Sequence, residues 1–186
     1  MATSKRAVGP EPIRFRGELS TIDDTTLVRF PEEASRQLPS RGQVAVRAVI
    51  DGHEFETVAE PDGRRGHWLR IEPQLQSAAG LGPGDSADVT VVVLQEWPEP
   101  DVPDDLGAAL TEAPAEIRDM WEDLTPMARW EWVRWVRSTN NPETRQRRVT
   151  VSISKMQNGK RRPCCFDLSS CTDPDLARSG KLREPS

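Results

Sequence analysis

Short runs of alternating apolar and polar positions, separated by glycine or proline, fill the first half of the chain. Alternation with a period of two is typical of half-buried strands, and the valine-rich run at 87–94 is typical of a buried barrel strand. Asp51-Gly52 between two such runs predicts a hairpin turn. Because the turns recur at regular intervals, the pattern favours a closed barrel over an open sheet. We expect strands at 13–19, 27–30, 44–50, 53–58, 67–71 and 87–94.

Helical periodicity replaces this alternation beyond Pro98, Pro100 and Pro103. Thr125-Pro126 supplies a capping residue followed by proline in the first turn of a helix. The last helix is indicated by apolar residues at i, i+4 and i+7. We expect helices at 104–111, 115–123, 125–138 and 143–156, besides two short helices within the barrel region at 32–38 and 73–79, the second ended by Gly80.

These patterns predict an α+β chain with four parts. A β-barrel domain occupies residues 13–100 and a helical module occupies 101–158. Residues 1–12 contain proline, glycine and charged residues and are expected to be disordered. Residues 159–186 are expected to form a loose, basic tail that contains all three cysteines.

The charge of the chain is unevenly distributed. The 186 residues carry a net charge of −5, made up of −5 over residues 1–100, −5 over 101–140 and +5 over 141–186. A basic tail on an acidic body indicates a nucleic-acid-binding tail, two regions that attract each other, or a solvated basic tail. The acidic body argues against broad duplex binding, because phosphate contacts supply most non-specific affinity.

No apolar run approaches the roughly 18 residues that a membrane span needs. The N-terminal residues 1–12 hold no apolar stretch of the kind found in a secretory signal, so we expect a cytoplasmic protein. In that compartment Cys164, Cys165 and Cys171 are expected to be thiols. The adjacent Cys164 and Cys165 are expected to have a packing role, with redox sensing as the alternative.

Neither a metal site nor a catalytic site is indicated. The two histidines, His53 and His67, lie about a hundred residues before the cysteines, and no paired zinc-ligand spacing is present. The sequence also lacks a triad, a Walker loop or a nucleophile motif. We therefore predict a protein that is not an enzyme and needs no cofactor or metal.

Tryptophan is concentrated in the third expected helix of the module. Trp130 sits about 160° from Trp132 on a helical wheel, so the rings of Trp130, Trp132 and Trp135 cannot all face one core. The structural interpretation is that Trp135 packs on the other helices. The functional interpretation is an aromatic surface for a peptide or flat ligand, joined by Trp68 and Trp97 from the barrel.

Two arginines one turn apart begin the last helix. Arg145 and Arg148, with Thr144, are consistent with a solvated or salt-bridged helix face. They are equally placed to hold a phosphate or carboxylate near a helix start, or to meet an acidic partner subunit. Our candidate ligand-binding residues are Trp68, Trp97, Trp130, Trp132, Trp135, Thr144, Arg145, Arg148 and His53.

Several short motifs, in order, carry a family likeness. They are Phe15-x-Gly17-x-Leu19, Ala78-Ala79-Gly80-Leu81 before Gly84-Asp85, Val102-Pro103-x-Asp105-Leu106-x-x-Ala109-Leu110, and Trp135 followed by Glu143-Thr144-Arg145-x-x-Arg148. Over residues 13–158 the chain resembles the YdeI/OmpD-associated, or bacteriocin-protection, family, with an N-terminal small-barrel domain of unknown function (number 1905).

The resemblance implies a double-split β-barrel, similar in architecture to AbrB/MazE-type proteins, followed by a helical module. It also implies an association with tolerance of bacteriocins and cationic antimicrobial peptides, without established catalytic residues. The chain departs from the family where Ser138-Thr139-Asn140-Asn141 replaces the Ala-Lys that often follows the tryptophan helix. The role of that lysine is therefore not carried over.

Three functional hypotheses follow. The first is a non-enzymatic cytoplasmic binding protein that gives tolerance or self-resistance by sequestering an antimicrobial peptide or small-molecule toxin. The second is an AbrB-like DNA-binding regulator, which the acidic barrel disfavours as a partner for nucleic acid. The third is an interaction or scaffold protein, with a homo-oligomer as a possible assembly.

Overall fold

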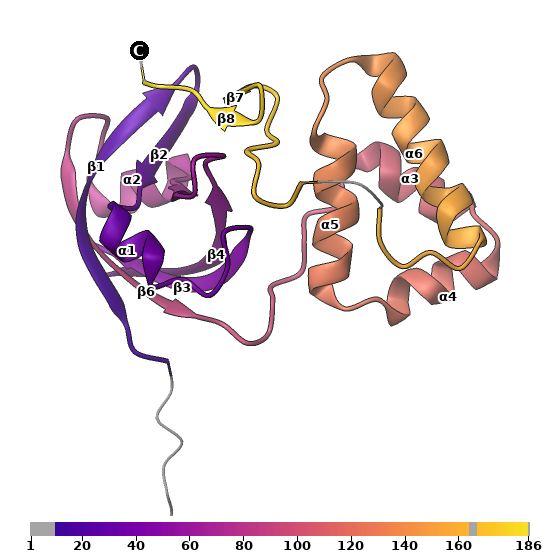
Figure 1. Ribbon diagram of the computed structural model, residues 1–186, viewed down its shortest axis with the longest axis horizontal. Helices are drawn as coiled ribbons and strands as arrows, with labels where there is room; N and C mark the ends of the chain where they lie inside the picture. The colour runs from indigo at the N-terminus through magenta and orange to yellow at the C-terminus, as the bar shows by residue number, and fades with distance from the viewer. Residues whose placement is uncertain (1–9, 164–166, 186) are drawn as a thin grey trace, which may run out of the picture.

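The computed structural model describes residues 10–163 and 167–185, in which a β-barrel is followed by a group of helices and the C-terminal segment returns to the barrel (Figure 1). The barrel is closed and antiparallel, in the order β1-β2-β5-β4-β3-β6. The α+β class and the N-terminal barrel are thereby confirmed. The strands are β1 (Ile13–Ile22), β2 (Thr25–Arg29), β3 (Val44–Ile50), β4 (His53–Pro61), β5 (His67–Arg70) and β6 (Ser86–Val93).

The period-two pattern places one face of each strand in the barrel core. Val44, Val46, Ala48 and Ile50 of β3 are all buried in one cluster, while Arg47 between them is exposed. The predicted turn joins β3 to β4: Asp51 and Gly52 have φ of 43° and 85°. Positive φ at both positions is the conformation of a two-residue hairpin turn that matches the twist of the flanking strands.

Two short helices lie beside the barrel, as predicted. They are α1 (Glu32–Arg36) and α2 (Pro73–Ala79), and α2 ends at Gly80, whose φ of 66° is left-handed. Helix α1 carries the buried Ser35, whose Oγ lies 2.7 Å from Nδ1 of His67 on β5. Nε2 of His67 lies 2.9 Å from the carbonyl oxygen of Gly42. A neutral ring satisfies both contacts, with Nε2–H donating to Gly42 and Nδ1 accepting from Ser35. Burial lowers the pKa of His67, against a smaller raising effect of the Gly42 hydrogen bond.

Acidification is expected to destabilise the barrel through His67. Because its pKa is lower in the folded than in the unfolded chain, the unfolded chain takes up the proton first as the pH falls below about 6.5. Stability then falls by at most about 1.4 kcal/mol per pH unit until the pH passes the folded pKa. Urea denaturation between about pH 5 and pH 8 measures this loss.

The matched comparison uses the two histidine variants. His67→Gln should remove this pH-dependent component, although the variant is less stable overall, whereas His53→Gln should keep it. Because the pKa of Glu60 is raised, Glu60 makes the free energy of unfolding fall as the pH rises, which is opposite to the effect of His67. Glu60 is present in all three proteins, so its contribution cancels in the comparison. Identical pH profiles for His67→Gln and the wild-type protein would contradict the prediction.

Four helices follow the barrel and pack around their own apolar core. They are α3 (Asp104–Glu112), α4 (Ala115–Asp123), α5 (Pro126–Arg137) and α6 (Pro142–Gln157), close to the predicted ranges. The side chain of Thr125 accepts a hydrogen bond from the backbone N–H of Ala128, and that of Asn141 accepts from Thr144, so both caps are made. The core contains Leu106, Leu110, Ala113, Ile117, Trp121, Leu124, Trp132, Val133, Val136, Val149 and Met156.

The C-terminal segment is not loose over the residues that the structure describes, and this part of the prediction was wrong. Residues 167–185 form a small hairpin of β7 (Ala177–Arg178) and β8 (Lys181–Leu182) that lies against the barrel. Leu176 and Leu182 are buried with Ile22, Leu27, Trp68 and Cys171. The apolar residues of this tail are too few to show a period, so only the barrel surface reveals what they cover.

Two predictions fall partly or wholly outside the residues that the structure describes. Residues 10–12 precede β1 without regular structure. The expectation of disorder over residues 1–9, and the packing role expected for Cys164 and Cys165, lie outside the described residues. No helix in the described ranges is both long and apolar enough to cross a membrane.

Candidate functional site

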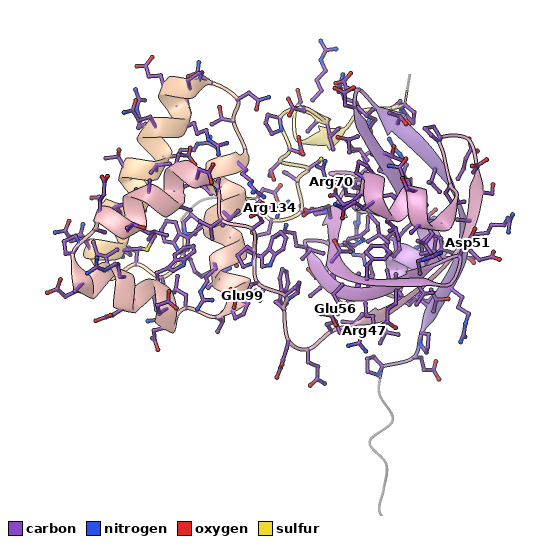
Figure 2. The ribbon with its side chains drawn as sticks, turned by 180° about the vertical axis from the view of Figure 1, so that it is seen from behind. Arg47, Asp51, Glu56, Arg70, Glu99 and Arg134 are labelled. Atoms are coloured by element: carbon purple, nitrogen blue, oxygen red, sulfur yellow. The ribbon has the colours of Figure 1, made fainter. Side chains whose placement is uncertain are left out.

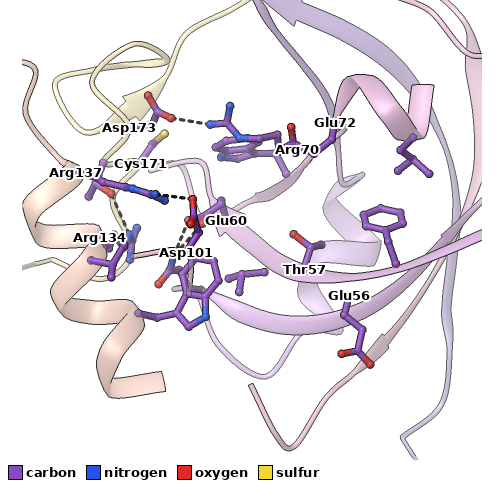
Figure 3. Close-up of a pocket in the computed structure, with 18 of the residues that line it drawn as sticks. Glu56, Thr57, Glu60, Arg70, Glu72, Asp101, Arg134, Arg137, Cys171 and Asp173 are labelled. Atoms are coloured by element: carbon purple, nitrogen blue, oxygen red, sulfur yellow. Dashed lines mark hydrogen bonds and ion pairs between the residues drawn. The ribbon is translucent and has the colours of Figure 1, made fainter. Parts of the chain in front are cut away.

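A cavity of about 550 Å³ lies where the barrel, helix α5 and the C-terminal tail meet (Figure 3). Strand β4 forms its floor, and β5 and α2 form one side. Helix α5 and residues 171–173 of the tail form the other side. The lining residues are Gln43, Phe55, Glu56, Thr57, Val58, Glu60, Trp68, Arg70, Glu72, Gln74, Leu75, Asp101, Trp130, Val133, Arg134, Arg137, Cys171, Thr172 and Asp173.

Two of the predicted tryptophans meet in this cavity from opposite domains. Trp68 on β5 is 2% exposed, and its indole N–H donates to the carbonyl oxygen of Pro61 at 3.2 Å. Trp130 on α5 is half-buried, and its indole N–H donates to the carbonyl oxygen of Pro98 at 2.7 Å. Trp97 packs edge-on against Trp130, with ring centroids 6.4 Å apart. The hydrogen bonds fix both indoles. The guanidinium carbon of Arg70 lies 5.8 Å from the ring centroid of Trp68, so Arg70 covers that ring and Trp130 is the aromatic wall that remains accessible.

The half-buried carboxylate of Glu60 lies between the barrel and helix α5 at the inner end of the cavity. The side-chain amide of Gln43 donates to both oxygens of Glu60, at 2.9 and 3.0 Å. Burial raises the pKa of Glu60, while the positive charge of Arg134 and the Gln43 hydrogen bond act in the opposite direction. Burial lowers the pKa of Arg134, and Glu60 is the largest opposing influence. Glu60 and Arg134 therefore attract each other across the boundary between barrel and helices.

Arg134 also holds the C-terminal tail. Its guanidinium group donates to the carbonyl oxygens of Leu168 and Ser170, at 3.1 and 2.6 Å, and to Oγ1 of Thr172 at 3.0 Å. Figure 2 shows Arg134 and Arg70 projecting into the space between the helices and the barrel. Arg70 pairs with Asp173 at 2.7 Å, which ties the same tail to β5. The tail wall of the cavity therefore depends on two arginines, one from each domain.

The cavity has a surplus of negative charge. Among the described residues that line it, five carboxylates accompany three guanidinium groups. Each guanidinium group has an acidic neighbour: Arg70 has Asp173, Arg137 has Asp101 at 3.1 Å, and Arg134 has Glu60. The remaining carboxylates are Glu56, which pairs with Arg47 outside the cavity, and Glu72, which is exposed at the start of α2.

Cys171 is the one predicted thiol that the structure describes. It is 3% exposed, and burial is the main reason that the pKa of its thiol is raised to about 11. The thiol therefore stays protonated at neutral pH and behaves as a small apolar group. Within the described part of the chain, no group of three or more histidine, cysteine or acidic residues is placed to hold a metal ion.

The other predicted tryptophans of α5 lie outside the cavity lining. Trp132 is fully buried in the core of the helical module, with its indole N–H donating to the carbonyl oxygen of Arg161 at 3.1 Å. Trp135 is half-buried, with the cationic groups of Arg148 and Lys155 at 5.5 and 5.6 Å from its ring centroid. The structural interpretation therefore accounts for Trp135, while Trp130 supplies the aromatic surface.

The predicted arginines of α6 are engaged within the helical module. Arg145 donates to both carboxylate oxygens of Asp105, at 2.6 and 3.2 Å, and this contact is the main cause of the lowered pKa of Asp105. Arg148 donates to the carbonyl oxygen of Trp135 at 2.9 Å and to the Ser138 hydroxyl. These contacts match the salt-bridged interpretation. Thr144 makes its capping contact through the backbone, and His53 lies in the β3–β4 hairpin.

Sequence reasoning missed the charged half of the cavity. The residues concerned come from five separate segments, and each resembles an ordinary surface residue in the sequence: Gln43, Glu60, Arg70, Arg134 and Asp173. One signal was available: Trp130, Val133, Arg134 and Arg137 recur at i, i+3, i+4 and i+7, so a single face of α5 carries all of its cavity residues.

Comparison with known proteins supports the resemblance found in the motifs. Residues 99–159 match the family described as Bacteriocin-protection, YdeI or OmpD-Associated. Residues 14–91 match a domain of unknown function, DUF1905. No curated protein matches the chain. Residues 92–98 separate the two matches. The cavity takes lining residues from both matched regions and from residues 171–173 of the tail.

Proposed function

We propose that this chain, in which a DUF1905 barrel is joined to a YdeI/OmpD-associated helical module, is a non-enzymatic cytoplasmic protein that binds a cationic, amphipathic toxin in the interdomain cavity. Sequestration of the toxin then gives tolerance. The observation that carries the proposal is one cavity that combines the fixed, half-buried indole of Trp130 with a surplus of carboxylates. The family description, bacteriocin protection, supports the same direction.

Charge and shape favour a cation with an apolar body. Aromatic faces attract cations that lie over them, and the attraction strengthens where water is excluded. Glu72 and Glu56, at the exposed side of the cavity, would draw a positive ligand inward. Phe55, Leu75 and Val58 supply apolar contact for the rest of the ligand. A volume of about 550 Å³ falls in the usual range for small-molecule sites.

The groups within the cavity are arranged for binding rather than for chemistry. Glu60, the candidate acid or base, is already held at both oxygens by Gln43 and attracted by Arg134. Cys171 is a protonated, buried thiol and so a poor nucleophile. Both groups serve better as a fixed charge and a packing group, which supports a role without catalysis.

Thermal denaturation against a mixed panel tests this function. The panel holds cationic peptides, natural-product antibiotics, small cationic aromatic molecules, nucleotides and duplex DNA. A ligand of the native state must raise the melting temperature, and we expect cationic members to do so. A shift confined to duplex DNA would instead support the regulator hypothesis. Silence across the whole panel would overturn the binding function.

Loss of the Trp130 ring is expected to weaken the binding of whichever panel member raises the melting temperature. Trp130→Ala removes the accessible indole wall, and we expect the dissociation constant to rise about tenfold, as for a central aromatic contact. Met127→Ala is the matched control, because Met127 lies on the same helix, is 45% exposed and does not line the cavity. Titration followed by calorimetry compares the two variants. Equal affinities in folded Trp130→Ala and Met127→Ala proteins would place the ligand elsewhere.

A further inference from the structure

The cavity wraps around the edge of strand β4. Phe55, Glu56, Thr57 and Val58 are consecutive residues, and all four line it. Successive side chains of a strand point to opposite faces of the sheet. A cavity that contacts four consecutive residues therefore either touches the backbone of the strand or reaches both of its faces, and an open edge of the strand allows both.

Strand pairing locates this open edge. Strand β4 pairs with β3 along its length, from Ile50↔His53 to Val44↔Ala59. On its other side it pairs with β5 only at Glu60↔Trp68 and Pro61↔His67. Residues 53–59 of β4 consequently have one partner strand, although the barrel is closed overall.

The register shows which backbone groups face the opening. In a two-residue hairpin the residues that flank the turn exchange hydrogen bonds, and hydrogen-bonded pairs then alternate along the ladder. The carbonyl oxygen of Ala45 accepts from the N–H of Leu94 on the β6 side, so the pair Ala45↔Val58 is not hydrogen-bonded. The N–H and C=O groups of Glu54, Glu56 and Val58 therefore point away from β3. No hydrogen bond to these backbone groups is present within the described residues.

From this edge we infer that the cavity receives an extended peptide, which adds to the barrel as a strand beside β4. This inference rests on the proposed binding function and specifies its ligand class. Strand addition to an exposed edge uses the backbone groups for affinity and alternate side chains for specificity. The unpaired groups of Glu54, Glu56 and Val58 supply the first requirement.

The side chains of β4 define the sequence pattern of the peptide. Glu54 and Glu56 are exposed on the outer face, and Figure 2 shows Glu56 beside Arg47 there. Phe55 and Thr57 lie on the inner face, where Phe55 packs against the barrel core together with Leu75 of α2. Because side chains directly opposite each other on neighbouring strands interact, the peptide fits with cationic and apolar residues in alternation.

The same carboxylates disfavour a second copy of this chain at the edge. Antiparallel pairing of two β4 strands about a twofold axis would place their glutamates opposite or diagonal to each other. Like charges in those positions destabilise a sheet, and charged edge strands are a common device against self-association. A cationic peptide replaces this repulsion with attraction, so charge complementarity selects it as the occupant.

Two decapeptides of equal charge test the inference on the full chain. One alternates lysine and valine, and the other, the methylated peptide, has the same sequence with a methyl group on every backbone nitrogen, so that it keeps the charge but cannot donate backbone hydrogen bonds to β4. We expect the lysine–valine peptide to bind at least about tenfold more tightly, because it alone completes the ladder. Amide exchange measured by NMR should slow at Glu54, Glu56 and Val58 when it binds.

Two protein variants at position 56 separate the contribution of the backbone N–H to peptide binding from that of the side-chain charge. Glu56→Pro removes one edge N–H and leaves the β3 ladder intact, whereas Glu56→Gln keeps that N–H and removes the charge. We expect Glu56→Pro to bind the lysine–valine peptide about tenfold more weakly than Glu56→Gln. Because Glu56→Pro can also perturb the strand itself, the peptide pair on the wild-type chain remains the deciding measurement.

Three outcomes overturn strand addition: equal binding of both peptides, protection of amides elsewhere, or no binding of either peptide. With the first two, a cationic ligand is still bound and the proposed function stands. The function fails only if the thermal panel is silent as well. Sedimentation of the chain without peptide measures its oligomeric state. A dimer that Glu56→Pro dissociates would identify a second copy of the chain as the occupant of the β4 edge and would overturn the peptide proposal.

Discussion

Replacing Arg134 with alanine is expected to lower the free energy of unfolding by about 3–5 kcal/mol, because its buried guanidinium group makes three hydrogen bonds to the tail and a hydrogen bond to a charged group contributes roughly 1.5–3 kcal/mol. Arg134 is 6% exposed. Its loss leaves Glu60 without its positive neighbour and frees the tail acceptors Leu168, Ser170 and Thr172. Urea denaturation measures the change, and limited proteolysis reports whether the tail is released.

Two comparisons make this result specific. Arg137→Ala, on the next turn of the same helix, breaks an exposed pair with Asp101 and should cost about 1 kcal/mol or less. Adding Glu60→Gln to Arg134→Ala should recover part of the loss, because the uncompensated charge is then absent. If Arg134→Ala costs no more than Arg137→Ala, the two domains and the tail are not held together as described.

Replacing Trp132 with alanine is expected to lower the free energy of unfolding by about 3–5 kcal/mol, as for other large aromatic residues removed from a core. Trp132 is fully buried at the centre of the helical module, and its ring packs edge-on against Trp135 with centroids 6.5 Å apart. Truncation leaves a void that the surrounding α3, α4 and α6 cannot fill without moving.

Trp130→Ala is the matched comparison, two residues away on the same helix. Its ring already faces a cavity, so less packing is lost, and we expect less than half the cost of Trp132→Ala. Urea denaturation of the two variants compares them directly. Equal costs would show that Trp130 is a core residue, and the cavity wall would have to be reassigned.

These two tryptophans also show how far sequence reasoning reached into the site. The helical wheel required one ring of α5 to leave the core, and Trp130 is the ring that does so. The wheel could not identify which ring faced the cavity and which faced the helical core, because both faces of α5 are covered, one by helices and one by the barrel. Trp68 and Trp130 both line one cavity, while their role as a ligand surface stays a prediction.

The anion-site interpretation of Arg145 and Arg148 stays a prediction. The structure gives each arginine an intramolecular contact, with Asp105 and with the C-terminal end of α5 respectively. Asp105 lies forty residues before Arg145, and nothing local in the sequence connects them. Sequence spacing predicts ion pairs only within one helix, at i, i+3 or i, i+4. Pairs between helices depend on how the helices pack, so spacing alone could not assign these partners.

The sequence by itself determined the barrel, its turns, the two short helices and the four-helix module, because these depend on local periodicity, on Asp51-Gly52 and Gly80, and on caps such as Thr125 and Asn141. Only the tertiary structure decided the site. The Gln43–Glu60–Arg134 contacts, the docked tail and the open edge of β4 join segments far apart in the chain. Their energies come from burial and from pairing across domains, and neither leaves a period in the sequence.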